Sequence, residues 1–135
     1  MYRVYSKNEK KWLKEGVYLS PNNDLYISKK TLFGTEKLIL VSDNKYIWHK
    51  DIGLYDKNDT LIFEGDICRI EHLDIVGVIA YASEHASYYI FDDKNSKYYT
   101  VRVDYCKQIE VIGNICENQN LLATEEQTEN EYADT

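Results

Sequence analysis

The sequence predicts a mainly β protein: an N-terminal antiparallel β-meander, then an SH3-like small β-barrel, then an acidic disordered C-terminal tail. Thirteen of its 135 residues are Tyr, which fits the half-buried pleated surface of a strand. Short apolar or alternating runs recur at close spacing, with turn-forming clusters between them. The chain ends in ATEEQTENEYADT, which is acidic and almost free of apolar side chains, so it buries too little surface to order itself.

The N-terminal region, residues 1–52, is predicted to be a meander subdomain of short antiparallel strands. The strands are expected at residues 2–5, 12–20, 25–28, 38–41 and 46–48, the second joining residues 12–13 to 17–20. Pro21 and the Asn and Asp residues after it predict a strong turn. Residues 29–37 are expected to be irregular. The continuous apolar run at 38–41 predicts a well-buried strand.

Residues 53–122 carry the clearer pattern and form the predicted barrel subdomain. A polar turn at 56–59 separates two strands, and Gly65 with Asp66 bends the chain into a third. The expected strands are 53–55, 61–63, 67–71, 76–81, 88–91, 98–101 and 109–115, with a single helical turn at 104–107. From residue 67 onward, four strands, one tight turn and a fifth strand follow in the order of an SH3-like barrel. Residues 123–135 form the disordered tail.

Charge is distributed unevenly along the chain. Residues 1–50 hold ten Lys/Arg and five Asp/Glu, a net +5, and residues 51–135 hold six Lys/Arg and eighteen Asp/Glu, a net −12, which together give −7. A net acidic chain binds nucleic acid poorly, because phosphate contacts need clustered cations. The acidic part instead suits a soluble, solvated domain or contact with a basic protein surface. The basic first part could also pair with the acidic part of a second copy, which would favour a homo-oligomer.

Several features predict a cytoplasmic protein. No run of 18 apolar residues is present, so we expect no transmembrane helix and no membrane partner. The start MYRVYS has no hydrophobic signal core, so we expect no secretion. Cys68, Cys106 and Cys116 are odd in number and lack CxxC spacing, which favours reduced thiols in or near the core.

The sequence contains no recognisable set of catalytic or metal-binding residues. His49, His72 and His85 are isolated and are best interpreted as solvated loop residues, because no third ligand stands at a typical spacing from any of them. Glu64 and Asp66 share a strand face that Glu71 does not, which disfavours paired-carboxylate chemistry. We therefore predict a non-enzymatic protein with no metal and no cofactor.

A tyrosine-rich hairpin is the best candidate for a binding site. Tyr88 and Tyr89 precede a polar loop that holds Asp92 and Asp93, and Tyr98 and Tyr99 follow it. Adjacent strand residues point to opposite faces, so one Tyr of each pair should face solvent or a partner. Ordinary cross-strand packing is the alternative. Exposed Tyr rings provide large rigid contacts in protein interfaces, and small barrels also stack single-stranded bases on such rings.

Two segments of the sequence together resemble the YopX family of phage and prophage proteins. They are GLYDKNDTLIFEGDI, residues 53–67, and IEVIGNICENQNLL, residues 109–122. The family patterns are of the type TGL-D-KNG-IYEGDIV and VIGNIYENPELL. Here Asp59 stands in place of the turn Gly and Gln119 in place of Pro, and the loss of Gly shifts the turn away from type I′ geometry.

The resemblance implies a mainly β fold found across temperate phages of Gram-positive bacteria, and it brings no catalytic residues. The motif residues also have a structural interpretation. Gly53, Gly65 and Gly113 supply backbone freedom, Asp66 and Asn114 tie turns, and Glu64 belongs to the same bend. Together these observations predict a non-enzymatic accessory protein in the cytoplasm of the bacterial host that binds a host or phage protein. The alternative is a small β-barrel that binds single-stranded nucleic acid or a nucleotide.

Overall fold

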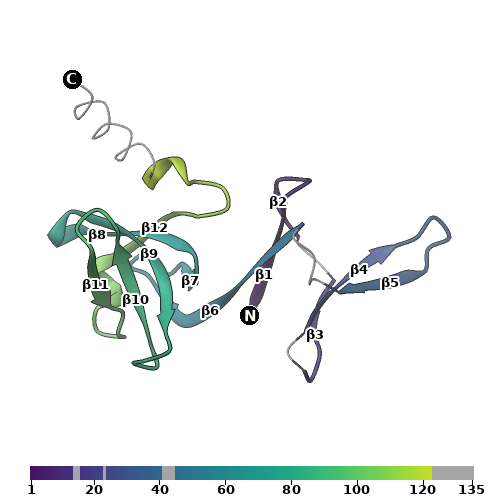
Figure 1. Ribbon diagram of the computed structural model, residues 1–135, viewed down its shortest axis with the longest axis horizontal. Helices are drawn as coiled ribbons and strands as arrows, with labels where there is room; N and C mark the ends of the chain where they lie inside the picture. The colour runs from purple at the N-terminus through teal and green to yellow at the C-terminus, as the bar shows by residue number, and fades with distance from the viewer. Residues whose placement is uncertain (14–15, 23, 41–44, 123–135) are drawn as a thin grey trace. The chain divides into compact units, whose positions relative to one another are not determined.

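The computed structural model describes residues 1–13, 16–22, 24–40 and 45–122 (Figure 1). The chain divides into two compact units, Met1–Lys50 and a second that begins at Asp51. Every strand pair in the described residues is antiparallel, which confirms the predicted mainly β class. The predicted tail, residues 123–135, lies outside the described residues. That residues 1–52 and 53–122 form separate subdomains stays a prediction.

The first unit contains two small sheets. Its strands are β1 (Tyr2–Ser6), β2 (Lys11–Trp12), β3 (Val17–Leu19), β4 (Leu25–Lys30), β5 (Glu36–Leu40) and the first part of β6 (Tyr46–Tyr55). β1 pairs with β2 on one side and with β6 on the other, whereas β3, β4 and β5 form a three-stranded meander. The buried core is small, because it consists of Val4, Leu25 and Ile27 with a few half-buried neighbours.

One predicted strand of this unit is wrong. Residues 12–13 and 17–20 do not share a strand, because Trp12 ends β2 in one sheet and Val17 begins β3 in the other. The Leu13 amide donates to the carbonyl of Val4 over 2.8 Å, and the Gly16 carbonyl accepts the Ser28 amide over 2.6 Å. Leu13 and Gly16 therefore bond strands of different sheets.

The predicted burial of the strand at 38–41 is also wrong. β5 is the edge strand of the meander, and only Ile39, opposite the buried Ile27, faces the core. Leu38 and Leu40 lie on the other face and are exposed. The two-residue period of a strand thus decides burial even within a continuous apolar run. Val41 lies outside the described residues.

The region from 29 to 37 is more regular than predicted. β4 continues to Lys30 and β5 begins at Glu36, so the two strands form a hairpin with a loop at residues 31–35. The amide of Thr31 donates to the carbonyl of Thr35 over 2.8 Å. The amide of Gly34 donates to the carbonyl of Thr31 over 3.0 Å. The loop is therefore a hydrogen-bonded turn, and it connects β4 to β5 in Figure 1.

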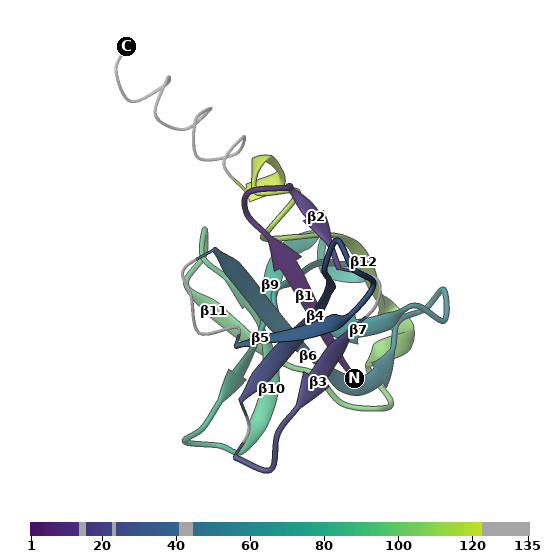
Figure 2. The ribbon, with the colours of Figure 1, turned by 90° about the vertical axis from the view of Figure 1, so that its right-hand side faces the viewer.

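The second unit is built on a five-stranded sheet. It contains the rest of β6, then β7 (Leu61–Phe63), β8 (Asp66–Ile70), β9 (Ile75–Ala82), β10 (Ser87–Asp92), β11 (Lys97–Thr100) and β12 (Ile109–Asn114). Short 3₁₀ helices, η1 (Glu71–Leu73) and η2 (Cys106–Gln108), follow β8 and precede β12. The strand order is β11-β10-β9-β8-β12. The last strand, β12, follows a helical turn and pairs with β8, the first strand of this sheet in the chain. This is the predicted SH3-like order, here as a half-barrel (Figures 1 and 2).

The core of the second unit lies on one face of this sheet. Its buried members are Ile62, Cys68, Ile70, Ile79, Ile90, Val101, Cys106 and Ile109. β9 and β10 approach closely at Gly77, where an added Cβ would lie 2.5 Å from Cγ2 of Ile90. Within the described part of the chain, no helix combines the length and apolar character needed to cross a bilayer.

Candidate functional site

The alternation of side chains along β10 and β11 separates the four predicted tyrosines into two pairs. Tyr88 and Tyr99 pack against the buried core. Tyr89 and Tyr98 lie on the opposite, outer face, since β10 and β11 pair with Phe91 opposite Tyr98. The prediction that one Tyr of each pair faces outward is therefore confirmed. Burial and the hydrogen-bonded carboxylate of Glu64 raise the pKa of Tyr88, which fits its inward position.

The outward rings form an aromatic group on the sheet surface. The centroids of Tyr89 and Tyr98 are 4.9 Å apart with the rings near perpendicular, and those of Phe91 and Tyr98 are 4.8 Å apart and stacked. Tyr98 is nonetheless 64% exposed. Sequence reasoning missed Phe91, although it stands two residues after Tyr89 and so belongs to the same strand face.

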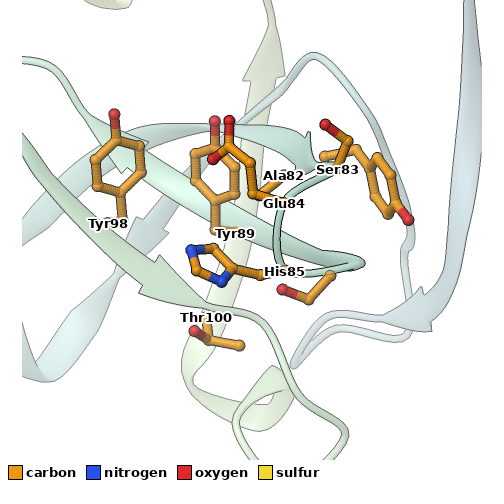
Figure 3. A pocket seen from close by; sticks show the side chains of 9 residues that line it. Ala82, Ser83, Glu84, His85, Tyr89, Tyr98 and Thr100 are labelled. Atoms are coloured by element: carbon orange, nitrogen blue, oxygen red, sulfur yellow. The ribbon is translucent and has the colours of Figure 1, made fainter.

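Next to these rings is an open hollow of about 710 Å³. Its lining residues are Tyr81, Ala82, Ser83, Glu84, His85, Ser87, Tyr89, Tyr98 and Thr100. Figure 3 shows the hydroxyl groups of Tyr89 and Tyr98 pointing the same way, with Glu84 and His85 contributed by the turn between β9 and β10. We call this surface the aromatic hollow. The sequence could not predict that the turn lines it, because the path of a hairpin turn over a sheet depends on tertiary packing.

The two predicted acidic binding residues differ in burial and in what they contact. Asp92 is buried, and its carboxylate accepts the backbone amide and the side-chain amide of Asn95 over 3.3 and 2.7 Å. It therefore holds the turn between β10 and β11, as Asp commonly does. Asp93 is exposed at the same turn.

The residues of the family motif are placed where they hold turns. Gly65 has a φ of +82°, which glycine adopts at low cost, and its amide and carbonyl bond Ile79 and Ile115. The Asp66 carboxylate accepts the Phe63 amide over 2.8 Å. In the second motif, the side-chain oxygen of Asn114 accepts the amides of Cys116 and Glu117 over 3.0 and 2.9 Å.

The remaining motif glycines lie at other backbone junctions. Gly53 has a φ of +77° inside β6, where the pairing with β7 is irregular. An added Cβ at Gly113 would lie 2.7 Å from the side-chain oxygen of Asn118. The structural interpretation of the motif therefore accounts for these residues without a ligand.

Asp56 is the residue that the sequence interpretation undervalued. It is fully buried, and its carboxylate accepts three backbone amides, from Asn58, Thr60 and Val111, over 2.8, 2.9 and 2.8 Å. Two of these lie in its own turn, as the polar composition of residues 56–59 suggests. The third lies on β12 and could not be foreseen from the local sequence. Asp56 thus joins the β6–β7 turn to the closing strand.

The histidines and thiols differ in their surroundings. His72 and His85 are exposed, as predicted, but the interpretation of His49 as a solvated loop residue is wrong. His49 is buried on β6 beside Trp12, and burial together with the nearby Arg3 lowers its pKa to about 4. Burial raises the pKa of both Cys68 and Cys106.

These groups do not assemble into a recognised reaction centre. Raised pKa values make the two buried thiols poor nucleophiles. Among the described residues, no group of three His, Cys, Asp or Glu side chains is arranged to hold a metal ion. What the aromatic hollow offers chemically is ring faces, hydroxyl groups, the imidazole of His85 and the carboxylate of Glu84.

The fold defines the class of this protein: a mainly β chain whose second unit is an SH3-like half-barrel. The sequence matches the family model described as YopX protein over residues 1–123, and the chain belongs to the YopX family. No curated protein sequence matches it significantly.

Two solved structures share the fold. Protein EF1440 from Enterococcus faecalis is 24% identical, with a TM-score of 0.51 over 90% of this chain and 96% of that one. Protein yopX from Bacillus subtilis is 14% identical, with a TM-score of 0.56 over 89% of this chain and 95% of that one.

Proposed function

We propose that this chain is a non-enzymatic accessory protein of a phage or prophage that acts by binding a host or phage protein. The contact surface is the aromatic hollow of the second unit. The observation that supports this assignment is the outer face of β10 and β11, where a 64% exposed Tyr98 stands over Tyr89 and Phe91 beside a hollow of about 710 Å³. Its site of action is the cytoplasm of the bacterial host.

The physical basis is the cost of leaving this surface in water. Large aromatic rings gain much free energy when a partner covers them, and Tyr loses little conformational entropy because it has two side-chain torsions. The rings here are already held against one another by their mutual contacts, so little further ordering is needed on binding. Such preformed aromatic groups are typical anchors of protein interfaces.

A protein partner is favoured over single-stranded nucleic acid by charge. Among the described residues that line the hollow there is no Lys or Arg, and Glu84 contributes a carboxylate. Phosphate groups would find neither Lys nor Arg in this lining, only the imidazole of His85 next to the carboxylate of Glu84. A nucleic acid is therefore the weaker candidate, although its bases could stack on the same rings.

A pull-down from nuclease-treated lysate of a Gram-positive host, read by mass spectrometry, tests the proposal. The tagged chain should retain one dominant host protein, and the Tyr89→Ala/Tyr98→Ala variant should lose it. The matched control is Tyr18→Ala/Tyr55→Ala, which removes two exposed rings, 51% and 55% exposed, that lie outside the hollow.

Two results would contradict the proposal. One is a captured protein that both double variants retain equally. The other is an empty pull-down together with salt-dependent binding of a single-stranded oligonucleotide that the hollow variant loses, which would instead support the nucleic-acid alternative.

A further inference from the structure

The tip of the β4–β5 hairpin presents the most exposed apolar side chains of the described chain. Leu32 is completely exposed and Phe33 is 94% exposed. They stand in a turn that is closed by backbone bonds and by contact between the hydroxyl groups of Thr31 and Thr35. Burying a Leu or Phe side chain is strongly favourable, so a formed turn that leaves both in water gives up a large gain.

The surroundings of this tip are basic. Lys30 ends β4 and Lys37 lies on β5, and both are exposed. The first 50 residues carry a net charge of +5, whereas residues 51–135 carry −12. The two parts of the chain therefore carry net charges of opposite sign, which favours the approach of this hairpin to the second unit of another copy.

We infer that the hairpin tip of one copy docks in the aromatic hollow of a second copy. This inference rests on the proposed function, because it names a second copy of the chain as a partner for the same surface, and a host protein would have to displace that copy. The hollow supplies ring faces for Leu32 and Phe33, and the exposed Glu84 in its lining faces the incoming Lys30 or Lys37. Figures 1 and 2 show the β4–β5 hairpin, and Figure 3 shows the hollow that receives its tip.

A contact between two different surfaces is heterologous, so each copy offers one tip and one hollow. Such contacts close into a ring when the rotation between copies allows it and otherwise extend as a chain. A single tip in a single hollow is a small interface and is expected to be weak. We therefore expect assembly to depend on protein concentration over about 1 µM to 1 mM, the range that spans weak complexes.

The test uses two variants that each lose one side of the contact. Leu32→Ser/Phe33→Ser removes the tip and keeps the hollow, whereas Tyr89→Ala/Tyr98→Ala removes the hollow rings and keeps the tip. In light scattering coupled to size exclusion, the wild-type chain should be oligomeric and each variant monomeric. An equimolar mixture of the two variants should form a dimer and nothing larger, because only one intact contact is left.

Controls separate this contact from misfolding and from charge alone. Leu19→Ser, which alters another exposed apolar residue of the first unit, should remain oligomeric. Glu84→Lys and Lys30→Glu should each weaken assembly, and the two changes combined in one chain should restore it.

Other outcomes overturn the inference. The inference is wrong if the wild-type chain is monomeric throughout the concentration range. It is also wrong if the chain is monomeric and sediments with anionic vesicles through Leu32 and Phe33. An oligomer that survives the hollow variant but not the tip variant places the docking surface elsewhere. None of these outcomes touches the proposed function, which the lysate pull-down with the hollow variant decides separately.

Discussion

Replacing Asp56 by Ala tests how much of the second unit depends on one buried carboxylate. The change removes the acceptor of three amides, two in the β6–β7 turn and one at Val111 on β12. Asn58 and Thr60 are exposed, so water can partly replace their bonds, whereas Val111 is half-buried and water reaches its amide less easily. Hydrogen bonds to a charged group contribute about 1.5–3 kcal/mol each, and an unsatisfied buried donor costs about 1–3 kcal/mol.

These contributions are offset in part because a buried charge is no longer desolvated. We therefore expect Asp56→Ala to lower the free energy of unfolding by about 3–4 kcal/mol. Asp56→Asn keeps one acceptor oxygen but turns an NH₂ group toward an amide, so it should lose about 2 kcal/mol. The free energy of unfolding of a small domain is about 5–15 kcal/mol, so both variants should fold but be clearly less stable.

Urea unfolding followed by circular dichroism measures these differences. Asp93→Ala is the matched control, because Asp93 is an exposed carboxylate in another hairpin turn of the same unit and should change stability by less than about 0.5 kcal/mol. If Asp56→Ala unfolds at the same urea concentration as the control, the carboxylate does not join the turn to β12 in the way described.

Three further predictions concern single residues. The pKa of His49 is about 4 in the folded chain, against 6.5 for an ordinary His, so its contribution to the free energy of unfolding is constant above pH 6.5. Between pH 6.5 and 4 the unfolded chain takes up a proton at His49 that the folded chain does not, so the free energy of unfolding falls by up to roughly 3 kcal/mol. Urea titrations of His49→Gln should show a flatter pH profile, and an equally steep one would refute the assignment. Asp59 has a φ of +61°, so Asp59→Gly should raise the free energy of unfolding by about 0.5–1 kcal/mol, whereas Asp59→Ala should not. The measurement is a raised Tm for the Gly variant. Gly77→Ala should lose about 1–3 kcal/mol, since its Cβ would meet Ile90 and the Phe91 carbonyl at 2.5 Å, and unchanged stability would show that β9 and β10 can separate there.

Sequence reasoning was most successful where local patterns decide the structure. The strands and turns of the second unit follow from alternation and from polar turn residues, and their spacing also predicts the SH3-like order. The same alternation separates Tyr89 and Tyr98 from Tyr88 and Tyr99. These predictions need only the geometry of a pleated strand.

Prediction from the sequence failed where contacts between distant parts of the chain determine the structure. The burial of His49 depends on Trp12 and Arg3, which approach it only because β1 pairs with β2 on one side and with β6 on the other. The exposure of Leu38 depends on how many strands the meander has and which face is covered. The hollow depends on where a turn lies relative to a sheet, which no local pattern encodes.

The pairing of β8 with β12 has a consequence for synthesis on the ribosome. β8 ends at Ile70 and its partner begins at Ile109, so 39 residues are translated before one side of β8 can be covered. At roughly 5–20 residues per second, this takes about 2–8 s. During that time a strand with three buried aliphatic or thiol side chains, Ile67, Cys68 and Ile70, has an open edge that other nascent chains can join. The charged Asp66 and Arg69 that interrupt this strand would then act as its protection against aggregation while it waits for its partner.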